Sequence, residues 1–207
     1  KIAYITACPE CATELVRVDG EANHYCPNES SCPPQIKGKI EHFISRKAMD
    51  IGFAEATVNL LFEKGYVTNV ADIFELQKEQ IEELEGFREK SASKMIQSIE
   101  DAKSVPFARV LYALGIRYVG ETVAKKLSMR FHHITKLAEA SLEELMDTDE
   151  IGEKIALSLI NWFSQDSNIL LIDRLMDNGI QFEIGDEVQT SLSTILEGKT
   201  FVVSGVF

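Results

Sequence analysis

The sequence predicts a mainly α-helical protein in which a small cysteine-rich module precedes a row of four helical hairpins, with short strands at either end. Three observations support this prediction. All four cysteines lie within the first 32 residues. A short pattern then recurs four times at nearly constant spacing, which indicates an internal repeat of one supersecondary unit. Between these repeats, apolar residues recur at the spacing of helical faces.

The repeat consists of an apolar residue, a turn residue, a glutamate and, three positions further on, a small apolar residue. Aligned on the turn residue, the copies are 34, 32 and 32 residues apart. Each copy predicts a hairpin whose second helix begins directly after the turn, with the glutamate complementing the helix dipole. The four copies are Phe53–Glu55 with Val58, Phe87–Glu89 with Ala92, Val119–Glu121 with Ala124, and Ile151–Glu153 with Ala156.

A glycine lies in or beside each turn, at Gly52, Gly86, Gly120 and Gly152. Because glycine has no Cβ, the backbone can bend sharply there and another molecule can come close. A helix that begins directly after such a turn presents unpaired N–H groups and the positive end of its dipole, which favours an anion such as phosphate. Four such turns at regular spacing therefore favour the binding of a repeating polyanion.

The alternative interpretation of these turns is purely structural, because glycine also precedes helices in hairpins that bind nothing. None of the four turns has glycine at both ends, and Glu150 would repel an anion at the fourth. The second and third turns are therefore stronger phosphate candidates than the first and fourth.

Composition is that of an ordinary globular protein, with 207 residues, 45% hydrophobic and 26% charged, enough for one sizeable core or two small domains. No apolar stretch approaches the roughly 20 residues of a membrane span. The net charge of −12 argues against a broad basic surface for nucleic acid. Positive charge is instead local, and clusters at residues 88–94 and 117–130 coincide with the second and third hairpins.

The cysteines follow the pattern Cys8-x2-Cys11-x14-Cys26-x5-Cys32. Two pairs of thiolates presented by tight turns can close a tetrahedral site, which is the usual geometry of structural zinc. Two disulfides or a redox pair are the competing interpretations. No export signal is visible and no βαβ pattern surrounds the cysteines, so zinc is favoured. Four cysteines fill the coordination shell, which leaves His24 as a surface residue and excludes catalysis at the metal.

The two ends of the chain predict short extended segments. Residues 1–7 are typical of the end of a strand. Polar residues 186–193 predict a linker, and an apolar strand follows it. Gly198-Lys199-Thr200 is similar to a phosphate-binding loop, but that loop requires glycine where Ser193 stands and a helix where a strand follows. The absence of an initial Met and the apolar run at the end indicate a piece of a longer protein.

Together these motifs closely resemble the NAD-dependent DNA ligases of bacteria. The resemblance rests on the cysteine spacing, on residues 40–50 (IEHFISRKAMD) and on residues 111–121 (LYALGIRYVGE), and it extends over essentially the whole chain. It implies that residues 1–7 end an OB-fold, 8–36 form a zinc finger, 37–187 form a helix-hairpin-helix DNA-binding domain, and 188–207 form a linker and the first strand of a BRCT domain.

Such ligases seal nicks by moving adenylate from NAD to a lysine and then to the 5′-phosphate, after which the 3′-hydroxyl attacks. This chain has no Lys-x-Asp-Gly motif, so no catalytic residue is expected in it and it should not ligate alone. Only Zn²⁺ would bind here, whereas NAD and Mg²⁺ would bind elsewhere in the full-length enzyme. The resemblance further implies a monomeric, cytoplasmic, nucleoid-associated protein without membrane contact.

The implied partner is nicked duplex DNA, held through its backbone phosphates. The first hairpin is shorter by about one residue than the family pattern and lacks the second glycine, so no contact is assigned to it. The candidate DNA-binding residues are Gly86, Arg88, Lys90, Ser91, Gly115, Arg117, Val119, Gly120, Glu121, Thr122, Lys125, Gly152 and Lys154.

Two other functions remain open at this point. The chain could be the DNA-binding module of a repair nuclease, although the zinc spacing and the BRCT-like end speak against it. It could also be a zinc-containing interaction scaffold without a DNA role, which the acidic balance supports and which predicts no salt-dependent DNA binding.

Overall fold

The computed structural model describes residues 5–17, 20 and 22–185. The linker and the BRCT-like strand predicted from residue 186 onward lie outside the described residues, as do residues 1–4 of the predicted first strand. Of that strand, Ala7 forms an isolated antiparallel bridge with Glu14. Within the described part of the chain, no helix is both long and apolar enough to cross a membrane.

The cysteine-rich module is built around two short strands, β1 (Val16–Arg17) and β2 (His24–Tyr25), which pair antiparallel with Val16 opposite Tyr25. It leads directly into α1 (Pro33–Ile44). Pro33 and Pro34 begin this helix, because proline has a helical φ and the first helical turn does not use its missing N–H.

The remainder of the described chain is helical, as predicted. Four helices, α2, α4, α6 and α9, begin at the glutamate of the sequence repeat, which confirms the register of all four copies. The elements after α1 are α2 (Glu55–Glu63), η1 (Ala71–Glu75), α3 (Lys78–Glu82), α4 (Glu89–Ala102), α5 (Phe107–Ala113), α6 (Glu121–Phe131), α7 (Ile134–Ala138), α8 (Leu142–Met146), α9 (Glu153–Phe163) and α10 (Asp166–Asp177).

The four hairpins are α1–α2, α3–α4, α5–α6 and α8–α9, and the two helices of each pack together. In every copy the small residue of the repeat is buried, at Val58, Ala92, Ala124 and Ala156. Its N–H donates to the carbonyl of the turn residue four positions earlier, at 2.9–3.1 Å. The repeat in the sequence is therefore a repeat of the same first helical turn.

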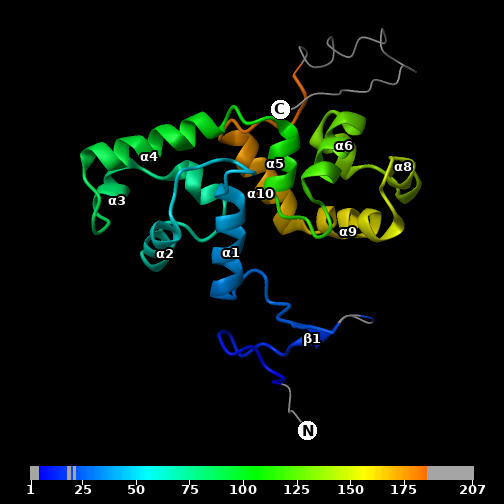
Figure 1. Ribbon diagram of the computed structural model, residues 1–207, viewed down its shortest axis with the longest axis horizontal. Coiled ribbons are helices and arrows are strands. Elements are labelled where there is room, and N and C mark those ends of the chain that lie inside the picture. Colours follow the sequence, from blue (N-terminus) through cyan, green and yellow to red (C-terminus); the bar gives the residue numbers. More distant parts are fainter. Residues whose placement is uncertain (1–4, 18–19, 21, 186–207) are drawn as a thin grey trace, which may run out of the picture.

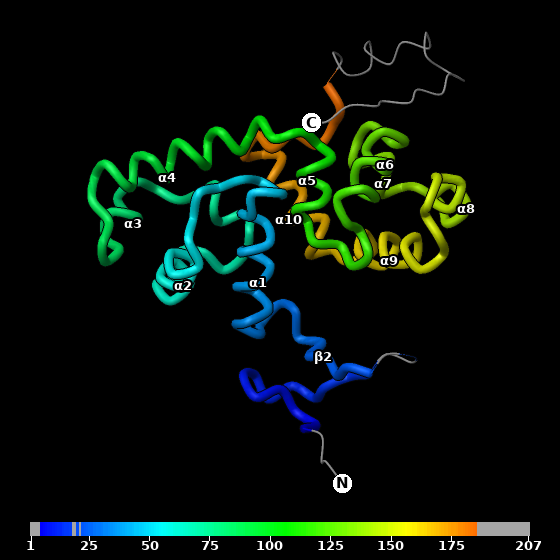
Figure 2. The backbone as a smooth tube through the Cα atoms, in the orientation of Figure 1, coloured from blue at the N-terminus to red at the C-terminus, as the bar shows by residue number. Residues whose placement is uncertain are grey.

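The first two hairpins lie on one side of the molecule and the last two on the other, with the cysteine-rich module projecting below α1 (Figure 1). The tube in Figure 2 shows α10 returning to the middle of the molecule, between these halves. There α10 packs on both η1 and α9. One continuous core, from Ile40 to Phe182, therefore joins all four hairpins.

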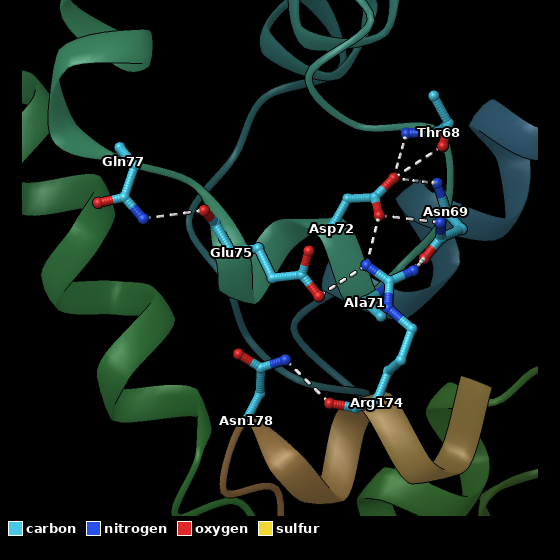
Figure 3. A network of polar contacts seen from close by, with 8 residues as sticks. All are labelled: Thr68, Asn69, Ala71, Asp72, Glu75, Gln77, Arg174 and Asn178. Atoms are coloured by element: carbon cyan, nitrogen blue, oxygen red, sulfur yellow. Dashed lines mark hydrogen bonds and ion pairs between the residues drawn. The ribbon is translucent and has the colours of Figure 1, made fainter. Parts of the chain in front are cut away.

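A polar network fastens α10 to the first half (Figure 3). Arg174 donates to Asp72 at 2.9 Å and to Glu75 at 2.6 Å, both in η1. Asp72 also accepts hydrogen bonds from the backbone N–H groups of Thr68 and Asn69. The network therefore links the loop before η1 to the last helix.

Candidate metal centre and nucleic-acid interface

The four cysteines converge in the cysteine-rich module, as predicted. Their sulfur atoms all lie within 4.8 Å of one another, with Cys8 and Cys32 3.9 Å apart and Cys11 and Cys26 3.5 Å apart. A zinc ion about 2.3 Å from each of four tetrahedral sulfurs would place them about 3.8 Å apart. All four thiols are free, so the structure does not contain the disulfides of the competing interpretation. The donor set and spacing fit zinc.

Two turns present the sulfurs. In the first turn the N–H of Cys8 donates to the carbonyl of Thr13, and in the second the N–H of Cys32 donates to the carbonyl of Asn28. Hydrogen bonding to Thr13 lowers the pKa of Cys11 to about 6, whereas burial raises the pKa of Cys32 to about 12. A bound zinc ion would hold all four as thiolates.

The four second helices begin alike. Their N-cap residues, Ala54, Arg88, Gly120 and Gly152, have extended backbones and no side chain that caps the helix. Nearby helices do have such caps, because His133 Nδ1 accepts from Thr135 N–H in α7 and Ser141 Oγ accepts from Glu144 N–H in α8. The absence of a cap is shared with α1, α5 and α10, and in α4 the side chain of Ser91 accepts a hydrogen bond from the N–H of Arg88. Among the proposed ends, α2, α6 and α9 have no capping side chain.

Gly120 and Gly152 are not required by the fold itself. Their φ angles are −83° and −84°, which any residue can adopt. A Cβ at either position would meet no atom of this chain within 4 Å. Since neither conformation nor packing demands glycine, the open space in front of these helices is available to another molecule.

We expected glycine to make the bend in every turn, and this is wrong for three of the four. Only Gly86 uses its conformational freedom, at φ +85°. In the third and fourth turns the equivalent left-handed residue is Tyr118 or Glu150.

The first turn has a different geometry from the others. Its left-handed residue is Asp50, four positions before the N-cap instead of two. Ten residues, 45–54, connect α1 to α2, compared with six in the second hairpin, 83–88. Within this chain, the first connection is therefore four residues longer than the second. The N–H of Gly52 donates to Ser98 Oγ at 3.3 Å, at the surface of the molecule.

Comparison with known proteins agrees with both parts of the structure. Residues 7–33 match the NAD-dependent DNA ligase C4 zinc finger domain. Residues 55–101 match a SAM-like helix-hairpin-helix tandem, and residues 109–172 match a helix-hairpin-helix motif. The chain is 54% identical to a DNA ligase of Flavobacterium psychrophilum over 100% of its length, and 55% identical to one of Flavobacterium johnsoniae over 99%.

This chain belongs to the NAD-dependent DNA ligase family. A DNA ligase of Parabacteroides distasonis is 51% identical over the whole chain. The chain spans 31% of the length of each of these ligases. The ligase zinc finger decides against the repair-nuclease interpretation.

The candidate contacts of the second hairpin lie together at the start of α4. Arg88 and Lys90 are exposed, beside Gly86. Ser91 Oγ accepts from the N–H of Arg88 at 2.8 Å, so this serine also orders the first turn of the helix. The basic pair therefore stands next to the positive end of the dipole of α4.

The candidates of the third hairpin divide into exposed and internal residues. Arg117, Gly120, Glu121, Thr122 and Lys125 are exposed around the start of α6. Val119 is only 4% exposed and its N–H donates to the carbonyl of Ile116, so its role in the ligase is packing. Gly115 is exposed, two residues after the end of α5, and has a φ of +67°; a Cβ there would lie 3.5 Å from the His42 side chain.

Two lysines were missed by the sequence reasoning. Lys47 lies 2.8 Å from Glu121, at the start of α6. Lys126 lies 2.6 Å from Asp149 and 3.0 Å from Glu150, in the fourth turn. The expected repulsion of an anion by Glu150 is therefore offset by Lys126. No local pattern could reveal these pairs, since each joins residues at least 23 positions apart.

The fourth hairpin contributes exposed Gly152 and Lys154. Lys154 Nζ lies 4.3 Å from the centre of the Tyr118 ring, and the Arg117 guanidinium lies 5.0 Å from the same ring. Arg117 also lies 5.2 Å from the Tyr25 ring in β2. Arg117 and Lys154, which come from two hairpins, thus share the Tyr118 ring, and Arg117 also contacts Tyr25 of the cysteine-rich module.

Proposed function

We propose that this chain is the duplex-DNA clamp of a ligase that seals nicks. The observation that carries the proposal is the common start of α2, α4, α6 and α9, which leaves the first N–H groups without a side-chain cap. Helix starts of this kind bind phosphate oxygens. Gly120 and Gly152, which the fold does not require, let a DNA backbone approach closely.

The second and third hairpins form the principal contact. Each combines an open helix start with exposed cations: Arg88 and Lys90 in one, Arg117 and Lys125 in the other. Gly152 and Lys154 extend the surface to the fourth hairpin. Contacts of this type hold the sugar-phosphate backbone and position the protein without reading the base sequence. That suits an enzyme that must act on any nick.

The zinc finger, residues 8–36, has a structural role. A bound Zn²⁺ would hold together a module whose regular structure is two strands of two residues each. Through Tyr25 and Arg117 the finger sets the position of the third hairpin relative to the residues that precede it. Residues 1–7 belong with a preceding OB-fold, 37–187 with the clamp and 188–207 with a BRCT domain.

The whole enzyme transfers adenylate from NAD to a lysine outside this chain and then to the 5′-phosphate of the nick. NAD and Mg²⁺ bind in that other part. The enzyme works as a monomer in the bacterial cytoplasm, at the nucleoid, in replication and repair. Under this proposal the present chain binds the nicked duplex but cannot seal it.

The test is binding of the zinc-loaded chain to a nicked duplex, an intact duplex and a single strand across a salt series. We expect duplex binding that weakens with salt, with a log–log slope of about −0.9 for each phosphate contacted. Binding to the two duplexes should exceed binding to the single strand. If no DNA binds at low salt, even after the missing part of the ligase is restored, the clamp proposal is wrong and the scaffold interpretation stands.

A further inference from the structure

The third and fourth hairpins place a side chain where the second has glycine. Tyr118 (φ +68°) and Glu150 (φ +64°) both lie two residues before an N-cap, as does Gly86. This left-handed conformation is unfavourable for residues with a Cβ. It persists where surrounding interactions hold it, and it is common at binding sites.

Each of these two side chains contacts the other hairpin. Tyr118, in the third turn, lies 4.3 Å beneath Lys154 of α9. Glu150, in the fourth turn, lies 3.0 Å from Lys126 of α6. Ser158 Oγ of α9 also donates a hydrogen bond of 2.7 Å to the carbonyl of Arg117, beside the third turn. The contacts between the two hairpins are therefore reciprocal. The third turn contacts α9, which follows the fourth turn, and the fourth turn contacts α6, which follows the third.

We infer that Tyr118 is a positioning residue for phosphate binding, with Glu150 as its counterpart, and that the two make the third and fourth hairpins one binding unit. The inference rests on the proposed function. Tyr118 holds Lys154 and Arg117 near one ring before DNA arrives. Cations that are already ordered lose less conformational entropy on binding than mobile ones. The strained left-handed backbone at Tyr118 then costs stability, but it places the ring where it can hold the two cations.

The first experiment compares Tyr118→Gly, Tyr118→Phe and Lys154→Ala in the zinc-loaded chain, by duplex affinity over a salt series. Tyr118→Gly removes the ring and relieves the backbone strain together, so the chain should fold at least as stably. Its duplex affinity should nevertheless fall by roughly two- to fivefold, the range of an exposed cation–π contact. Tyr118→Phe retains a ring and should retain affinity.

A matched control separates strain relief from loss of the ring. His132 ends the same helix, α6, and is also left-handed, at φ +61°. His132→Gly should therefore change stability in the same direction as Tyr118→Gly while leaving duplex affinity unchanged. Equal losses of affinity in the two variants would overturn the inference, because backbone flexibility would then explain both.

A double-mutant cycle tests whether Tyr118 acts through Lys154. If it does, the losses of the two single variants should not add. The double variant Tyr118→Gly/Lys154→Ala should lose less affinity than the sum of the single losses, because only the effect of Tyr118 on Arg117 remains once Lys154 is gone. Losses that add fully, or an unchanged affinity in Tyr118→Gly, contradict a positioning role. Glu150→Gly should also weaken binding, although it removes a negative charge. Unchanged or tighter binding removes Glu150 from the inference.

A readout without DNA keeps this inference separate from the proposed function. The ring current of Tyr118 should shift the side-chain NMR signals of Lys154 upfield in the native chain, and Tyr118→Leu should return them to ordinary values. If the chain binds no DNA but the shift is present, the clamp is wrong and the contact between hairpins stands. If the chain binds DNA but no shift is present, the positioning role is wrong and the clamp stands.

Discussion

Arg174 in α10 donates a hydrogen bond to the carboxylate of Asp72 in η1 at 2.9 Å, although 102 residues separate them in the sequence. Asp72 is mostly buried, with 17% of its side chain exposed, and Arg174 is one third exposed. The pair lies where the last helix returns to the first half of the molecule. It therefore helps to set how the two pairs of hairpins are placed relative to each other.

Arg174→Met should destabilise the chain by roughly 2 kcal/mol, because it takes a charged donor from a partly buried carboxylate. For a protein of this size that corresponds to a fall in Tm of about 4–8 °C. Thermal unfolding followed by circular dichroism measures it. Arg130→Met is the control, since Arg130 and Asp147 form an exposed pair at 3.4 Å and should contribute little. Equal changes in Tm for both substitutions would show that the network around Asp72 contributes no more stability than an exposed ion pair.

Stability should depend on pH through Asp72. Burial alone would raise the pKa of this carboxyl, but hydrogen bonds from Thr68, Arg174 and Asn69 lower it below its ordinary value. A depressed folded-state pKa means that the stabilisation is complete above the unfolded pKa of about 3.9 and is lost as the pH falls through the folded value. Urea unfolding of native chain and Asp72→Asn should therefore show a constant difference above about pH 5 that narrows in more acidic solution. A difference that persists undiminished at pH 2 would contradict this.

Gly120→Ser should affect folding and DNA binding in opposite directions. Serine can cap α6 and the new Cβ meets no atom of the chain, so the free energy of unfolding should rise by a few tenths of a kcal/mol. The same side chain occupies the space in front of the first N–H groups, so duplex affinity should fall. Gly38→Ala is a matched control, since a Cβ at Gly38 also meets nothing, but within α1. The Gly38→Ala variant should have a higher free energy of unfolding than the native chain and an unchanged duplex affinity.

Cys26→Ser should release zinc and loosen the zinc finger while leaving the hairpins folded. The hairpin core extends from Ile40 to Phe182 and contains no cysteine, so most of the helical circular dichroism should remain. Bound zinc per chain is measured by elemental analysis. His24→Ala is the control and should retain the metal, because His24 is exposed and outside the sulfur cluster. Stoichiometric zinc in the serine variant would refute the assignment of Cys26 as a ligand.

Local chemistry made much of this protein predictable from sequence. The four hairpin helices begin at the glutamates of the repeat, because a turn followed by a helix start is specified by a few adjacent residues. The convergence of the four cysteines was likewise predictable, since two pairs of cysteines need only short turns to come together. The start of α1 at Pro33 was not predicted, because proline both interrupts helices and begins them.

The sequence by itself determined where each helix of the repeat begins and which four sulfurs converge, because both depend on neighbours along the chain. Only the tertiary structure decided which residues bend the turns, that Lys126 neutralises Glu150, and that Arg174 reaches Asp72. The two ion pairs join residues that are far apart in the sequence, and their energies depend on distances that exist only after the helices have packed.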